Sequence, residues 1–173
     1  MSKQKTLKAP FSVIGIGLHT GEKATLTVHP AGDNHGLKFQ RVDVDGEPII
    51  NADADLVVDT SRSTTLEKNG VKIITTEHIL AALSGMEIDN ALIQIDSPEV
   101  PIMDGSAFAF VEAINQVGIV EQETEKDYFV VTENLTYEDL DRQTEMLLVP
   151  QDEFRLTVMV DYNSPTLGTQ HAH

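Results

Sequence analysis

An acidic residue and a histidine stand side by side at Glu77 and His78, just after the apolar run 71–74. The apolar residues that follow the pair fall at helical spacing, which predicts that Glu77 and His78 occupy the first turn of a helix. A helix N-terminus carries about half a unit of positive charge, so it favours an ionised carboxylate and a neutral imidazole. In those states the imidazole can bind a metal ion, and the carboxylate can take a proton from a metal-bound water.

Taken alone, the pair has a plainer interpretation, in which Glu77 stabilises the start of a helix and His78 is a surface residue. A catalytic zinc ion needs three protein ligands, and no further ligand lies nearby in the sequence. The bare pair therefore favours the structural interpretation, and a metal centre requires support from the surrounding sequence.

The composition narrows the classes of partner. The 173 residues carry a formal net charge of −16, which repels nucleic acid and anionic lipid, so no nucleic-acid partner is expected. No apolar run approaches the roughly 20 residues of a transmembrane segment, and the N-terminus lacks the apolar stretch of a secretory signal. Cysteine is absent, which excludes thiolate chemistry and fits a reducing, cytoplasmic setting.

The first part of the chain has the patterns of strands. An apolar run at 11–18 and alternating patterns at 24–28 and 37–41 predict three of them, and the last two are expected to pair as a hairpin. Residues 63–66 and 71–74 flank an Asn-Gly pair, whose tolerance of positive φ predicts a second hairpin.

Two helices are expected to follow. The first spans 76–84 and is capped by Gly85, and the second spans 106–117, after a buried strand at 91–95. Ser106 is expected to cap the second helix. The residues of that helix expected to face the core are Phe108, Val111, Ala113 and Ile114.

These elements predict an α+β fold, in which a sheet carries two helices packed on one face as a two-layer sandwich. The first domain is expected to cover 1–120, and the acidic run 121–127 is expected to be a linker. The strands within 128–163 are expected to open a second, incomplete domain, because strands without a covering layer make a poor stopping point. Their uncovered edges predict self-association. Residues 164–173 would form a polar tail.

Four motifs resemble those of the UDP-3-O-acyl-N-acetylglucosamine deacetylases, the zinc enzymes of lipid A biosynthesis. They are GIGLHTG at 15–21, TEHILAALSG at 76–85, IDNALI at 88–93 and SPEVPIMDGS at 97–106. They occur in the family's order and at about its spacing, and the resemblance covers essentially the whole chain. It implies two domains that share a topology, so the second domain is expected to be similar to the first.

The resemblance also implies roles for particular residues. His78 matches the first zinc ligand and Glu77 the general base that activates the zinc-bound water. His19 matches a histidine near the active site with a supporting role. Ser63 and Thr65 match the border of the glucosamine pocket, in a stretch where the sequence departs from many members. Asp161 and Tyr162 match an acid–aromatic pair that meets the uracil ring, with two residues ending a strand as the alternative.

The expected activity is hydrolysis of the N-acetyl group of UDP-3-O-acyl-N-acetylglucosamine. In the family, a helix of the second domain supplies the other two zinc ligands, a His and an Asp four residues later. Here the only histidines after His78 are His171 and His173, in the polar tail. The chain by itself is therefore expected to be inactive. The alternatives are a non-catalytic nucleotide-sugar binding domain or a protein-interaction domain of the same fold.

Overall fold

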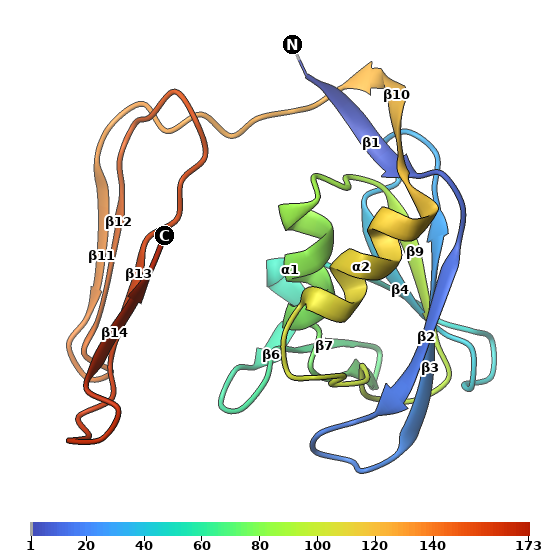
Figure 1. Cartoon of the computed structure of the whole chain (residues 1–173), viewed down its shortest axis with the longest axis horizontal. Coiled ribbons are helices and arrows are strands. Elements are labelled where there is room, and N and C mark those ends of the chain that lie inside the picture. Colours follow the sequence, from blue (N-terminus) through green and yellow to red (C-terminus); the bar gives the residue numbers. More distant parts are fainter. Residues whose placement is uncertain (1) are drawn as a thin grey trace. The chain divides into compact units, whose positions relative to one another are not determined.

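The computed structural model describes residues 2–173, which form two compact units divided between Lys126 and Asp127. We call the part up to Lys126 unit 1 and Asp127–His173 unit 2. Figure 1 traces the order of their elements.

A five-stranded mixed sheet is the base of unit 1. Its order is β2 (Phe11–Ile16), β3 (Lys23–Pro30), β9 (Ala91–Ile95), β4 (Leu37–Arg41) and β5 (Ile49–Asn51). Alternate residues of β3 and β9 are fully buried, as the period of two in a half-buried strand requires.

The expectation that residues 24–28 and 37–41 pair as a hairpin is wrong. Strand β9 lies between β3 and β4, antiparallel to the first and parallel to the second. Alternation shows which face of a strand is buried but not which neighbour it pairs with. The more apolar β9 occupies the centre of the sheet, and the connection from β3 to β4 passes its end, where Ala91 donates a hydrogen bond to the carbonyl of Gly36.

Helices α1 (Glu77–Gly85) and α2 (Phe108–Val117) pack on one face of this sheet (Figure 1), which confirms the α+β sandwich. Ile79 and Leu83 of α1 and Phe110 and Ile114 of α2 are fully buried in the shared core. The expectation that Phe108 faces the core is wrong, because its side chain is 60% exposed and Phe110 takes that place.

The predicted caps of both helices differ from the observed ones. The N-cap of α2 is Ala107 rather than Ser106, although the Ser106 hydroxyl accepts a hydrogen bond from the amide of Phe108, the first residue of α2. Gly85, expected as the C-cap of α1, is instead its last residue, and the cap is Met86.

A three-stranded sheet leads into α1. It consists of β6 (Val57–Asp59), which follows the 3-10 turn η1 (Ala54–Leu56), and of β7 (Thr65–Lys68) and β8 (Val71–Ile73). The predicted hairpin is confirmed by the antiparallel pairing of β7 with β8. Asn69 and Gly70 form its turn with φ of 53° and 82°, as an Asn-Gly hairpin turn requires.

The acidic run expected as a linker is for the most part a strand. Residues Ile119–Glu125 form β10, which pairs with the N-terminal strand β1 (Lys3–Leu7). The charged run does not have the apolar pattern of a buried strand, because none of the residues of β10 is fully buried. Lys3 of β1 forms an ion pair with Glu123 of β10.

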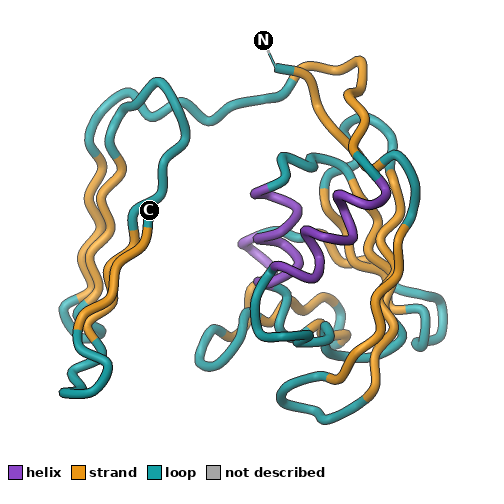
Figure 2. Tube along the Cα trace, in the orientation of Figure 1, coloured by secondary structure: helices purple, strands orange, loops and turns teal. Residues whose placement is uncertain are grey.

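Unit 2 consists of two antiparallel ladders, visible in Figure 2 as separate pairs of strands. Strand β11 (Leu135–Asp139) pairs with β12 (Thr144–Leu148), and β13 (Val158–Asp161) pairs with β14 (Thr169–Ala172). The expected polar tail is therefore in part a strand, because Thr169–Ala172 completes the backbone hydrogen bonds of β13. Within residues 2–173, neither helix has the length and apolarity needed to cross a membrane.

Candidate functional site

The chain enters α1 through a residue in an uncommon backbone conformation. Thr75, only 1% exposed, has a φ of 62°, in the left-handed region that β-branched residues rarely adopt. Such a conformation costs about 1–3 kcal/mol and persists only where surrounding contacts hold it. At Thr75 it turns the chain from β8 into the helix that begins with Glu77 and His78.

The first turn of α1 is tied to the stretch that precedes β7. Oε2 of Glu77 accepts a 2.9 Å hydrogen bond from the Thr64 amide. The carbonyl of Thr64 in turn accepts hydrogen bonds from the amide of Thr76, at 3.2 Å, and from its hydroxyl, at 3.0 Å. Glu77 and His78 are both half-buried, so Glu77 is held in place and neither side chain is sealed from a ligand.

Ser63 and Thr65 flank the residue that binds Glu77. Ser63 is half-buried and Thr65 is buried. The structure thus brings both residues to the head of α1, with Ser63 the more accessible of the two.

His19 lies in the turn between β2 and β3, and its side chain is exposed. The turn is closed by hydrogen bonds from Gly17 to the carbonyl of Glu22 and from Gly21 to the carbonyl of Gly17. The His19 amide donates to Glu99, at 3.0 Å from Oε1 and 3.1 Å from Oε2.

Glu99 also contacts the start of α1. Its Oε1 accepts a 2.8 Å hydrogen bond from the Thr75 hydroxyl, and its Oε2 accepts from the amide and hydroxyl of Thr20, at 2.7 and 2.8 Å. One carboxylate therefore joins the His19 turn to Thr75, at the entry to α1. The sequence pattern does not reveal this link, although Glu99 is the only acid in the Pro-bounded part of the loop, Ser-Pro-Glu-Val-Pro.

The pKa of Glu99 reflects these contacts. Burial by itself would raise it, but the backbone amides of Thr20 and His19 and the hydroxyls of Thr20 and Thr75 outweigh the burial and lower it below 4.5. Hydrogen bonds donated to a carboxylate stabilise its charged form. Glu99 is therefore an ionised group at neutral pH.

Asp104 belongs to the same loop and caps the entry to α2. Its Oδ1 accepts hydrogen bonds from the amide and hydroxyl of Ser106, at 3.0 and 2.8 Å. The hydrogen bonds from the amide and hydroxyl of Ser106 lower the pKa of Asp104. This geometry supports a turn-capping role for Asp104.

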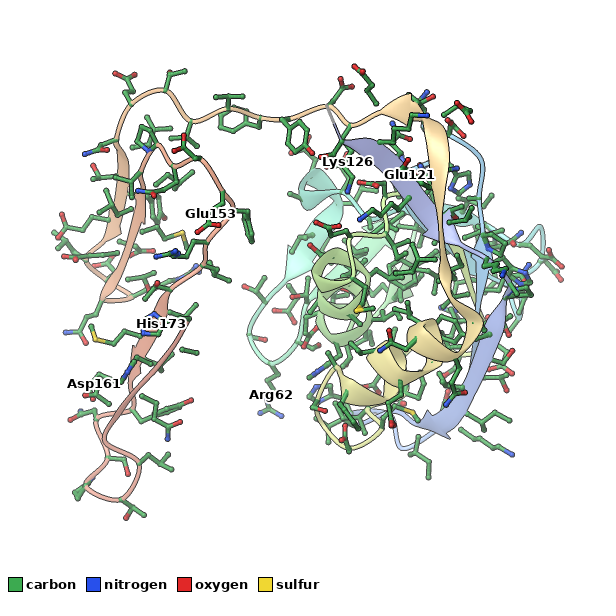
Figure 3. The ribbon with its side chains drawn as sticks, turned by 45° about the horizontal axis from the view of Figure 1, so that its top comes forward. Arg62, Glu121, Lys126, Glu153, Asp161 and His173 are labelled. Carbon is green, nitrogen blue, oxygen red and sulfur yellow. The ribbon has the colours of Figure 1, made fainter. Side chains whose placement is uncertain are left out.

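Asp161 and Tyr162 lie in unit 2, on and just after β13, and both side chains are exposed (Figure 3 labels Asp161). Oδ1 of Asp161 accepts a hydrogen bond from the Asn163 amide, and the amide of Tyr162 donates to Gly168. These contacts shape the turn between β13 and β14 and leave the phenol ring of Tyr162 free to stack.

No group of three or more His, Cys, Asp or Glu side chains arranged to hold a metal ion occurs within residues 2–173.

The chain matches the family model of UDP-3-O-acyl N-acetylglycosamine deacetylase over residues 4–173. The chain belongs to this deacetylase family. It is 47% identical over 172 residues to a bifunctional enzyme LpxC/FabZ of Bacteroides thetaiotaomicron, covering 99% of this chain and 37% of the relative. It is 46% identical over 165 residues to the UDP-3-O-acyl-N-acetylglucosamine deacetylase of Methylococcus capsulatus, covering 95% of this chain and 54% of the relative.

A deacetylase of Myxococcus xanthus is 43% identical over 167 residues, or 52% of its length. The chain therefore spans between about a third and about half of the length of these relatives. On unit 1, Glu99 links the His19 turn to Thr75, and Thr64 links Glu77 to Thr76.

Proposed function

We propose that the protein to which this chain belongs hydrolyses the N-acetyl group of UDP-3-O-acyl-N-acetylglucosamine during lipid A biosynthesis. The observation that carries the proposal is the Glu77–His78 pair in the first turn of α1, in a chain of the deacetylase family. The substrate is the one in the names of the Methylococcus and Myxococcus relatives. Because the chain covers 54% and 52% of those two proteins, the activity is proposed for the whole protein.

Glu77 would act as the general base. The Thr64 amide holds Oε2 at 2.9 Å, which fixes the carboxylate and leaves Oε1 to take a proton from the attacking water. A carboxylate within hydrogen-bond reach of the attacking water is the first requirement of general base catalysis.

Zinc dependence is part of the proposal. His78, half-buried at the helix start, can supply one imidazole nitrogen, whereas a catalytic zinc ion needs three protein ligands. The remaining ligands would come from outside residues 2–173, within which no group of three ligands is gathered. When bound, zinc would polarise the acetamide carbonyl and supply a water of lowered pKa. The 173-residue chain alone is therefore expected to bind zinc weakly and to have no turnover.

The remaining roles concern the substrate. His19, Ser63 and Thr65 would border the sugar, since contacts through Glu99 and Thr64 tie their segments to the head of α1. Tyr162 would stack on the uracil ring and Asp161 would accept a hydrogen bond from its edge. The substrate is a nucleotide sugar, and the proposed setting is the cytoplasm.

The test is acetate release from radiolabelled substrate by the full-length protein and by two variants. Glu77→Gln is expected to keep bound zinc and to lose about 100-fold to 10,000-fold in kcat, which is the usual contribution of a general base. His78→Ala is expected to lose both the metal and the turnover. His29→Gln is the matched control, because His29 lies on β3 with its ring bonded to Gln94.

Wild-type turnover in either site variant would contradict the proposal, and so would acetate release by the purified 173-residue chain. Binding of UDP without hydrolysis would favour the nucleotide-sugar binding alternative. Calorimetry with UDP, comparing the full-length protein with Tyr162→Ala, separates that outcome from no binding.

A further inference from the structure

Glu99 is a carboxylate with no exposed surface, in the loop between β9 and α2. Its partners are the amides of His19 and Thr20 and the hydroxyls of Thr20 and Thr75. None of the ion pairs within residues 2–173 includes Glu99. A buried charge needs full hydrogen bonding, and here the donors come from two segments that are far apart in the sequence.

We propose that Glu99 is a positioning residue for the deacetylation site. Its carboxylate fixes the His19 turn against the turn that opens α1, so that His19 and the Glu77–His78 pair keep one relative geometry. The inference rests on the proposed function for the identity of the reaction, whereas the coupling itself rests on the hydrogen bonds.

The main chain around Glu99 joins the same two segments. The amide of Val100 donates to the carbonyl of Ile74 at 3.0 Å, and the Ile74 amide donates to Pro98 at 2.9 Å. Two residues further on, the amide of Ile102 donates to Ile16 at 3.0 Å. The loop thus spans from the end of β8 to the end of β2, and Glu99 projects between them from a fixed backbone.

Gly17 provides the space for the carboxylate. A β-carbon at this position would lie 2.4 Å from Oε2 of Glu99 and 2.4 Å from the hydroxyl oxygen of Thr20. Real β-carbons do not approach other atoms so closely, so the hydrogen bonds of Glu99 to the His19 turn depend on a glycine here. The His19 turn therefore packs closely around the carboxylate of Glu99.

Thr75 is the residue through which Glu99 contacts the start of α1. Its left-handed conformation needs contacts that hold it, and its hydroxyl donates to the Glu99 oxygen that also accepts from the His19 amide. A shift of either segment would lengthen a hydrogen bond to that shared atom. Displacements of about 1 Å in a catalytic group can lower turnover about 100-fold.

The first test uses amide NMR spectra of the 173-residue chain with Glu99→Gln. The amide protons of His19 and Thr20 are expected to move upfield as they lose a charged acceptor, and the amides of Thr75 to His78 are expected to move with them. Asp89→Asn is the matched control, because Asp89 accepts a hydrogen bond from the Lys5 amide in the same unit. Its effects should stay near Lys5.

The second test removes the link from the other side. Thr75→Val deletes the hydroxyl while keeping the branched shape, and it is expected to move the His19 and Thr20 amides. Thr75→Ser keeps the hydroxyl and should leave those amides near their wild-type positions. If Glu99→Gln loses the dispersed spectrum of a folded protein, these two Thr75 variants still test whether Glu99 couples the His19 turn to the start of α1.

The third test measures turnover by the full-length protein. Glu99→Gln is expected to lower kcat about 10-fold to 100-fold with little change in KM, and Glu99→Asp is expected to recover part of the loss. The positioning role is overturned if kcat is unchanged, or if the Glu99→Gln shifts stop at His19 and Thr20. A wild-type protein without deacetylase activity would instead overturn the proposed function, and the spectra would still decide whether Glu99 couples the two segments.

Discussion

The backbone amide of Thr64 lies 2.9 Å from Oε2 of Glu77 and donates a hydrogen bond to it. Thr64 also accepts two hydrogen bonds from Thr76 through its carbonyl. The residue that would act as base is therefore held by main-chain groups, whose positions are set by the β7–β8 hairpin and the start of α1. Such a carboxylate is oriented before any substrate binds.

This contact predicts different stabilities for two substitutions at one position. Glu77→Gln keeps a side-chain oxygen for the Thr64 amide and is expected to change the free energy of unfolding by less than about 0.5 kcal/mol. Glu77→Ala leaves that amide without its partner and is expected to cost about 1 kcal/mol. Urea unfolding followed by far-UV circular dichroism measures both, and an equal loss in the two variants would contradict the assignment.

The lowered pKa of Glu99 predicts a pH dependence of stability. A carboxyl group whose pKa is lower in the folded state than in the unfolded chain contributes stability above the unfolded value, and this contribution is lost as the pH falls through the folded value. At pH 7, Glu99→Gln is expected to be less stable than the wild type by about 1–3 kcal/mol. The difference should narrow as the pH falls below 4.5, the ordinary value of the group.

The two units can be followed separately in that experiment. Far-UV circular dichroism at helical wavelengths reports the unfolding of unit 1, which holds α1 and α2. The tyrosine signal reports unit 2, because all three tyrosines lie there: Tyr128, Tyr137 and Tyr162. The exposed Glu112 of α2 supplies a control, since Glu112→Gln should change stability by less than about 0.5 kcal/mol. A stability difference for Glu99→Gln that stays constant from neutral pH to pH 3 would contradict the role of its charge.

The close approach at Gly17 predicts opposite effects for two glycine substitutions. Gly17→Ala forces the carboxylate of Glu99 or the hydroxyl of Thr20 to move and is expected to cost about 1–3 kcal/mol, as other overpacked sites do. At Gly32 an added β-carbon meets no atom within 4 Å, so Gly32→Ala is expected to be neutral or to stabilise by up to about 1 kcal/mol. Thermal unfolding of both variants checks the pair, and a fully stable Gly17→Ala protein would rule out the packing described here.

The two aromatic residues at the start of α2 offer a direct comparison. Phe110 has no exposed surface, whereas Phe108 is 60% exposed. Phe110→Ala is expected to destabilise unit 1 by about 3–5 kcal/mol, because it removes a large buried side chain and leaves a cavity. Phe108→Ala should cost less than about 1 kcal/mol, and a reversed order would show that the helix is rotated relative to the sheet.

The apolar surface of unit 2 predicts self-association of the 173-residue chain. Phe154 is 93% exposed and Met159, on β13, is 73% exposed, and exposed apolar patches beside strands favour association. Light scattering is expected to give an apparent mass that rises with concentration. The double variant Phe154→Ser, Met159→Lys should reduce the rise, and a monomer at high concentration in the unaltered chain would refute the prediction.

The sequence predicted those parts of the fold that depend on local patterns. The positions of α1 and α2 and the β7–β8 hairpin followed from helical spacing and from Asn69 and Gly70. The neighbours of β9 could not be predicted from the sequence pattern. The alternation of apolar and polar residues does not determine which strands pair, because pairing depends on contacts between segments far apart in the chain. The β10 strand was missed for a related reason, since a charged ribbon lacks the apolar pattern by which strands are recognised.

In the candidate site, too, the sequence predicts some residues and does not reveal others. Glu77 and His78 stood out because their types suggest chemistry, and their place in the first turn of a helix was read from spacing. The contribution of Glu99 could not be read in that way, since its partners at Thr20 and Thr75 are 79 and 24 residues away. Thr64 was equally hidden, because it acts through its amide and carbonyl groups, which every residue type except proline possesses.

The pairing of β1 with β10 brings the beginning and the end of unit 1 next to each other, with Leu7 opposite Ile119 and Lys3 opposite Glu125. A module whose entry and exit adjoin can be circularly permuted or inserted into a host protein with little rearrangement of its interior. New termini opened at the exposed Asn69–Gly70 turn, with a short peptide joining the old ones, should preserve the sheet and both helices. Unit 1 could therefore be transferred between proteins as one domain, by recombination as well as by design.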